Sequence, residues 1–179
     1  MLKKLNEFTP EEFESQKHPF SIKRLSTTIG AELHDIDLTK DLSKEEIGHI
    51  YNALLTYKVI FFRDQNITTE EHLRFGQYFG ELEIHPFAPL GTNREDHPEV
   101  LRITHDEENK PKENAWHSDV TWRQEPSLGS ILRMIETPPV GGDTLFASME
   151  SAYENLPDAI KEKIDGAYAV HDFTIFRKR

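Results

Sequence analysis

The sequence contains no cysteine, so disulfide bonds, thiolate zinc sites and cysteine nucleophiles are excluded. No apolar run approaches the ~20 residues that a membrane-spanning helix needs. The first residues turn acidic at Glu7, before any apolar core of the kind that a secretory signal contains. We therefore expect a cytoplasmic protein that does not associate with a membrane.

Positive charge is also scarce. The chain has 21 Lys and Arg residues and 32 Asp and Glu residues, which gives a formal net charge of −11. Such a surface repels phosphate groups, so we expect no nucleic-acid partner, although a few local arginines would still admit a small anionic substrate. A length of 179 residues suits one globular domain. We assign residues 1–179 to that domain, with residues 1–17 as a loose arm or a short helix.

Local signals in the first half of the chain predict alternating strands and helices. Strands are indicated by β-branched and aromatic runs. Helices are indicated by capping boxes, in which a Ser or Thr N-cap is followed three residues later by Glu. The predicted elements are two short strands within residues 20–37, a helix over about 44–56 capped by Ser43 and Glu46, a buried central strand at 57–63, and a helix that begins with Thr68 and Glu71 and runs to Phe79.

The second half is predicted to be richer in strands. It begins with a long polar region, residues 83–115, which suits a lid or binding loop or plain flexibility. Proline and glycine then separate short apolar runs. The predicted elements are strands at 100–104, 116–122, 130–135, 144–147 and 168–173, and a helical segment from Ser148 to Asp165 that is divided at Pro157 and ended by Gly166.

The run Trp116–Trp122 pairs an imidazole with a carboxylate, at His117 and Asp119. On a strand these two side chains lie on the same face. One nitrogen and one oxygen ligand are two thirds of the 2-His-1-carboxylate triad that binds iron(II) and leaves positions open. The motif alone is more typical of a surface histidine beside a solvated carboxylate than of a metal site. Thr144 follows a Gly-Gly turn, from which its hydroxyl could bind a carboxylate of a co-substrate, although the segment alone is more typical of an ordinary turn between strands.

Several blocks of sequence, in this order, resemble the taurine dioxygenase family of iron(II)/2-oxoglutarate-dependent oxygenases. The resemblance covers about residues 20–175 and corresponds to the N-terminal two thirds of that family. The blocks are Ile29–Glu32, Ile36–Thr39, Val59–Gln65, Phe79–Pro86, Trp116–Trp122, Pro138–Phe146, Ala152–Leu156 and Val170–Phe173.

The resemblance implies an α+β, mainly β fold: a double-stranded β-helix (jelly roll) core with flanking helices, incomplete at the C-terminus. It implies that Fe(II), 2-oxoglutarate and O2 are required. His117 and Asp119 would be the first two iron ligands, and Thr144 would bind the carboxylate of 2-oxoglutarate. His85 matches a position that contacts the sulfonate of the substrate, and Glu113 stands where the family has a substrate-binding asparagine.

The implied reaction is hydroxylation of a small organic substrate: a sulfonate or an alkyl sulfate, with release of sulfite or sulfate, or alternatively a carboxylate. Ala88 stands where the taurine-specific member has a tyrosine, which argues against taurine itself. The family's second iron histidine and the arginine that binds 2-oxoglutarate lie further along its sequence than this chain extends. We therefore expect a truncated chain, inactive alone, whose further ligands a homo-oligomer would have to supply.

His171 is not a candidate for the missing ligand, because it falls before that region, and we interpret it as a structural histidine in a strand. Two other functions stay open. One is a non-catalytic binding or interaction module that kept the early half of the fold. The other is a hydrolytic zinc enzyme that uses His117 and Asp119, although no third zinc ligand occurs at a fitting spacing.

Overall fold

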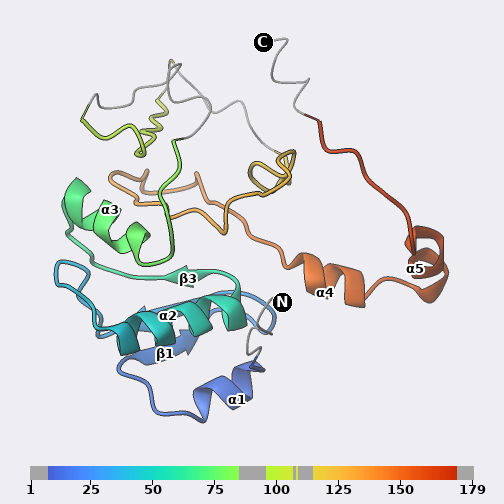
Figure 1. Ribbon diagram of the computed structural model, residues 1–179, viewed down its shortest axis with the longest axis horizontal. Helices are drawn as coiled ribbons and strands as arrows, with labels where there is room; N and C mark the ends of the chain where they lie inside the picture. Colours follow the sequence, from blue (N-terminus) through green and yellow to red (C-terminus); the bar gives the residue numbers. More distant parts are fainter. Residues whose placement is uncertain (1–7, 85–95, 107, 109–114, 173–179) are drawn as a thin grey trace. The chain divides into compact units, whose positions relative to one another are not determined.

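The structure is a computed structural model, and it describes residues 8–84, 96–106, 108 and 115–172. The chain divides into two compact units, one of residues 1–79 with 134–164 and one of residues 80–133 with 165–179. The helices and strands of the described residues all belong to the first unit (Figure 1). They are α1 (Pro10–Glu14), β1 (Ser21–Arg24), β2 (Ala31–His34), α2 (Lys44–Tyr57), β3 (Ile60–Phe61), α3 (Thr69–Gln77), α4 (Met149–Glu154) and α5 (Asp158–Ile164).

The strands form one mixed sheet in the order β1-β2-β3. β1 and β2 are antiparallel, with Ile22 opposite Leu33, and they confirm the two strands predicted within residues 20–37. β2 and β3 are parallel, with Ala31 opposite Ile60. Helix α2 provides the crossover between these two parallel strands, as a parallel pair requires.

The predicted central strand at residues 57–63 is wrong in both length and position. Helix α2 continues to Tyr57, whose buried ring belongs to the core. Lys58 then takes a positive φ of 65° and turns the chain. Only Ile60 and Phe61 pair with a neighbour, so β3 is a short edge strand in the described sheet, and β2 is its centre.

Both predicted capping boxes are confirmed. The Ser43 hydroxyl accepts from the backbone N–H of Glu46, and the Glu46 carboxylate accepts in turn from the backbone N–H of Ser43. Thr68 and Glu71 make the same pair of bonds at the start of α3, which ends at Gln77, two residues before the predicted end. The longest described helix, α2, has 14 residues, and none of the described helices is long and apolar enough to cross a membrane.

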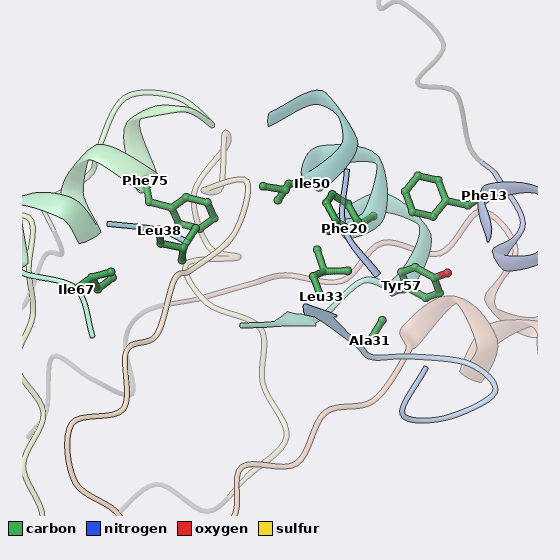
Figure 2. Close-up of a cluster of buried hydrophobic side chains, with 10 residues drawn as sticks. Phe13, Phe20, Ala31, Leu33, Leu38, Ile50, Tyr57, Ile67 and Phe75 are labelled. Atoms are coloured by element: carbon green, nitrogen blue, oxygen red, sulfur yellow. The ribbon is translucent and has the colours of Figure 1, made fainter. Parts of the chain in front are cut away.

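The hydrophobic core gathers side chains from the sheet and from helices α1, α2 and α3. Figure 2 shows these side chains between α2 and the strands and, further along, beside α3. Burying them removes their apolar surface from water, which is the main force that holds this unit together. The core residues are Phe13, Phe20, Ala31, Leu33, Leu38, Ile50, Ala53, Tyr57, Ile67 and Phe75.

Residues 8–17 contain helix α1, the second of the two forms expected for the N-terminal segment. Phe13 anchors the helix with a fully buried ring. Arg24 on β1 binds the Glu14 carboxylate at 2.6 Å, and the Tyr57 hydroxyl donates to the same carboxylate at 2.8 Å. The hydrogen bond from Arg24 is the main reason that the pKa of Glu14 is lowered.

The later part of the chain contains fewer strands than predicted. Residues 100–104, 116–122, 130–135, 144–147 and 168–172 form none, so these strand predictions are wrong, and Phe173 lies outside the described residues. The divided helix is confirmed by α4 and α5, and Gly166 follows with a φ of 70°. The described residues are therefore α+β, with more helix than strand, and they contain no barrel, so the expectation of a mainly β chain is wrong for this part.

Candidate metal centre

The predicted metal motif lies on a turn and not on a strand. Val120 takes a φ of 46°, in the left-handed region that β-branched residues rarely adopt. The backbone N–H of Arg123 donates to the carbonyl of Val120 at 3.0 Å and closes the turn. A β-branched residue held in this region costs of order 1–3 kcal/mol, so the surrounding contacts must favour the turn over an extended strand.

The turn nevertheless brings the two predicted ligands together. His117 Nε2 lies 3.4 Å from Asp119 Oδ1. The other ring nitrogen of His117, Nδ1, lies 2.9 Å from the carbonyl oxygen of Ala115. A carbonyl only accepts hydrogen bonds, so Nδ1 is the donor of this pair and Nε2 is the ring atom that faces Asp119. The side chains are 67% and 61% exposed, which leaves both donor atoms accessible.

Two contacts outside the motif hold this turn, and neither was predicted from the sequence. The Ser130 hydroxyl donates to Asp119 Oδ2 at 3.2 Å. His171 Nδ1 lies 2.9 Å from the hydroxyl oxygen of Thr121. His171 is not in a strand, so that part of its interpretation is wrong. Both contacts join residues far apart in sequence, and no spacing rule connects them.

A third group of contacts lies at the far end of the turn. The guanidinium of Arg123 forms an ion pair with Glu83, whose carboxylate also accepts from the Ser127 hydroxyl. The same guanidinium lies over the ring of Trp122, 5.2 Å from its centroid. Arg123 therefore neutralises Glu83, a carboxylate of the same unit, and leaves the charge of Asp119 available for another cation.

The donor set fits iron(II). Two ligand atoms that lie ~2.1 Å from an ion and at right angles to one another are about 3.0 Å apart, close to the observed His117–Asp119 separation. Imidazole nitrogen and carboxylate oxygen are the donors of 2-His-1-carboxylate iron sites. A metal-binding histidine commonly donates its second N–H to a carbonyl, as His117 does to Ala115.

This pair supplies two donors, and the described residues contain no group of three or more His, Cys, Asp or Glu side chains that could hold a metal ion. A catalytic zinc site takes three protein ligands. The hypothesis of a zinc hydrolase therefore gains no third ligand from the part of the chain that the structure describes.

Thr144 belongs to the other compact unit. It follows the turn at Gly141 and Gly142, which have φ values of 81° and 74° and so need glycine, and its side chain is exposed. Two residues later, the ring of Phe146 packs edge-on against Phe61 of β3, with centroids 6.1 Å apart. This contact fixes the segment that carries the Thr144 hydroxyl against the sheet of its own unit.

The predicted substrate contacts His85 and Glu113 lie outside the described residues. Both stay predictions from the family resemblance. The structure places neither side chain relative to His117, Asp119 or Thr144.

Comparison with known families gives a match over nearly the whole chain. The matching family is described as taurine catabolism dioxygenase TauD, TfdA family, and residues 21–178 match it. The match includes His117, Asp119 and Thr144, as well as the two predicted substrate contacts outside the described residues.

Individual relatives match at about a third identity. An alkylsulfatase from Acinetobacter baylyi is 35% identical over 151 residues, which cover 84% of this chain and 46% of the relative. An alpha-ketoglutarate-dependent sulfate ester dioxygenase from Pseudomonas putida is 34% identical over 165 residues, which cover 90% of this chain and 51% of the relative. The chain thus spans about half the length of these curated relatives, less than the expected two thirds.

A solved structure is also covered over about half of its length. The crystal structure of a taurine dioxygenase from Burkholderia xenovorans superposes with a TM-score of 0.70 and 40% sequence identity. The aligned region covers 82% of this chain and 51% of that chain. About half of a larger chain of this type therefore aligns with this chain.

Proposed function

The chain belongs to the TauD, TfdA family of dioxygenases, and we propose that it provides the first two iron ligands of an iron(II)/2-oxoglutarate-dependent dioxygenase. The family uses Fe(II), 2-oxoglutarate and O2. We extend the proposal to the fold, with the described sheet and helices flanking a double-stranded β-helix (jelly roll) core. The finer assignments below, to ligands, co-substrate and substrate class, are parts of the same proposal.

One observation supports this function above the others: Nε2 of His117 and Oδ1 of Asp119 converge at 3.4 Å while their remaining polar atoms are bound elsewhere. The Ala115 carbonyl binds Nδ1 and the Ser130 hydroxyl binds Oδ2, so Nε2 and Oδ1 are the atoms left to bind an ion together. A cation bound by these two atoms would satisfy both of them at once.

The residues divide the work of binding. His117 contributes a neutral nitrogen and Asp119 a negative oxygen, so the pair lowers the charge of a divalent ion by only one and leaves it able to bind an anionic co-substrate. Thr144 supplies a hydroxyl donor for a carboxylate of 2-oxoglutarate. When bound, iron(II) with 2-oxoglutarate supplies the oxygen chemistry that hydroxylates the substrate.

For the substrate we propose an alkyl sulfate or an organic sulfonate. Two relatives at about a third identity are named for sulfate esters. Hydroxylation of the carbon that bears the sulfur oxyanion gives a product that collapses to an aldehyde and releases sulfate or sulfite. His85 would bind the oxyanion, and the carboxylate of Glu113, by repelling a second anionic group nearby, would favour a substrate with a single oxyanion.

The metal assignment is tested on the 179-residue chain with Mn²⁺, an ion that resists oxidation and accepts the same donors as Fe²⁺. We expect Mn²⁺ to broaden the backbone amide resonances of residues 115–123 selectively in NMR spectra. His117→Ala and Asp119→Ala should each abolish the selective broadening, whereas His97→Ala should leave it intact. Equal broadening in all four proteins would refute the site.

The reaction is tested by measuring 2-oxoglutarate-dependent succinate formation with Fe(II), ascorbate and a series of alkyl sulfates and sulfonates. We propose that the 179-residue chain does not turn over alone, because two protein ligands hold iron weakly and the family requires more. Robust turnover would contradict the inactivity while supporting the reaction class. Ligand-observed NMR with hexyl sulfate, and with hexanol as control, tests the substrate class without turnover. His85→Ala should weaken the binding of hexyl sulfate and leave the binding of hexanol unchanged.

The second candidate is a non-catalytic binding module. It is favoured by one observation, that the described residues offer two ligand side chains and no third. Calorimetry separates the two functions, since a dioxygenase segment should bind 2-oxoglutarate more tightly after Mn²⁺ has been added. A binding module should show no such dependence.

A further inference from the structure

The two oxygens of the Asp119 carboxylate have different partners. Oδ1 faces Nε2 of His117 at 3.4 Å. Oδ2 accepts the hydroxyl proton of Ser130 at 3.2 Å. The carboxylate is thereby held with one oxygen toward the proposed ion and the other toward a neutral donor.

We propose that Ser130 is a positioning residue, which makes Asp119 a monodentate ligand through Oδ1 and keeps Oδ2 away from the ion. The proposal rests on the proposed function, because it concerns the same metal pair. It adds a residue, from a segment 11 positions further along the chain, that no motif of the sequence indicated.

Monodentate binding matters because a carboxylate can bind a cation through one oxygen or through both. A bidentate Asp119 would occupy two positions of a six-coordinate ion. The proposed reaction needs the free positions for a chelating co-substrate and for oxygen. A hydroxyl that already donates to Oδ2 raises the cost of turning this oxygen toward the ion, since the hydrogen bond would be lost.

A purely structural role for this hydrogen bond is the competing explanation. Asp119 is 61% exposed and Ser130 is also exposed, so their hydrogen bond contributes little to the stability of the fold. The carboxylate itself has few other constraints, since it projects from an exposed turn. The hydrogen bond therefore affects the orientation of the Asp119 side chain more than the stability of the fold.

The test compares Ser130→Ala with Ser130→Thr, which restores the hydroxyl, in the 179-residue chain. Ser127→Ala is the matched control, because the Ser127 hydroxyl also binds a carboxylate of the same unit, that of Glu83, without contacting Asp119. Circular dichroism first verifies that all variants fold. Mn²⁺ affinity is then measured by the selective broadening of the amide resonances of residues 115–123.

We expect Ser130→Ala to weaken Mn²⁺ binding about tenfold, the lower end of the effects found for partners of metal ligands. Ser130→Thr and Ser127→Ala should bind as the unsubstituted chain does. Bulk-water proton relaxation per bound Mn²⁺ should also fall by roughly a quarter in Ser130→Ala, because a bidentate carboxylate displaces one of about four bound waters.

Unchanged affinity and relaxation in Ser130→Ala would overturn the assignment of Ser130 while leaving the metal site intact. An equal loss in Ser127→Ala would also overturn it, since the effect would then not be specific to Asp119. Absence of selective Mn²⁺ binding by the unsubstituted chain would overturn the proposed metal site and this inference together.

Discussion

Helix α1 offers the most decisive test of the packing of the N-terminal segment, through the substitution Phe13→Ala. The Phe13 ring is 0% exposed, although its helix has only five residues. It packs against His18 with ring centroids 4.2 Å apart and against Tyr57 at 6.0 Å. A loose arm could not bury an aromatic side chain in this way.

The expected loss follows from the buried area. A phenylalanine ring buries roughly 150–200 Å², and at ~25 cal/mol per Å² its transfer from water contributes about 4–5 kcal/mol. Measured Phe→Ala substitutions in cores cost about 3–5 kcal/mol. We expect Phe13→Ala to lower the free energy of unfolding by about 3 kcal/mol or more, and Phe13→Leu, which nearly conserves volume, by less than about 1.5 kcal/mol.

The assay combines urea unfolding, followed by far-UV circular dichroism, with an NMR titration of Glu14. The carboxylate of Glu14 depends on α1 staying docked, because the hydrogen bond from Arg24 is the main cause of its lowered pKa. In Phe13→Ala the pKa of Glu14 should therefore rise toward its ordinary value of 4.5. A loss below about 1 kcal/mol, with the pKa of Glu14 still lowered, would show that Phe13 is not a core residue.

Two further predictions concern backbone strain and pH. Lys58 has a φ of 65°, and the N–H of Val59 donates to the carbonyl of Tyr57 at 2.7 Å, which defines a strained γ-turn. Lys58→Gly should therefore raise the free energy of unfolding by roughly 0.5–1 kcal/mol, although it loses a partly exposed ion pair with Glu150. Lys58→Ala should not raise this free energy. The Thr39 hydroxyl, by hydrogen bonding, is the main cause that lowers the pKa of Asp37 from 3.8 to about 2. The pKa of Asp37 is lower in the folded than in the unfolded chain, so its ionisation stabilises the fold above about pH 4, and this stabilisation is lost as the pH falls through about 2. In Thr39→Val, NMR titration should find the pKa of Asp37 closer to 3.8.

The helices were predictable because their signals are local. A capping box satisfies two backbone N–H groups with side chains only three residues apart, so Ser43 with Glu46 and Thr68 with Glu71 carry their own structural information. Pro157 and Gly166 act equally locally on the last helical segment. None of these signals depends on what the rest of the chain does.

Most strand predictions were wrong because the signals that decide a strand are not local. A strand exists through its hydrogen bonds to a neighbour, and a run of β-branched residues does not specify where that neighbour is. Leu132 and Ile135 have the composition of a strand, yet they are 65% and 75% exposed and form no ladder. Ile22 and Leu33, in contrast, pair across a short connection and become strands as predicted.

The proposed metal site likewise combines local contacts, which the sequence can predict, with distant contacts, which it cannot. The family resemblance, and not the spacing alone, indicated His117 and Asp119 as ligands, and a turn brings the two side chains together although a strand was predicted. Their orientation depends on the carbonyl of Ala115, which is local, and on the hydroxyl of Ser130, which is not. A site with only two donors depends strongly on each donor being held in place. Among exposed substitutions outside the pair itself, we therefore expect one at Ser130 to weaken metal binding most.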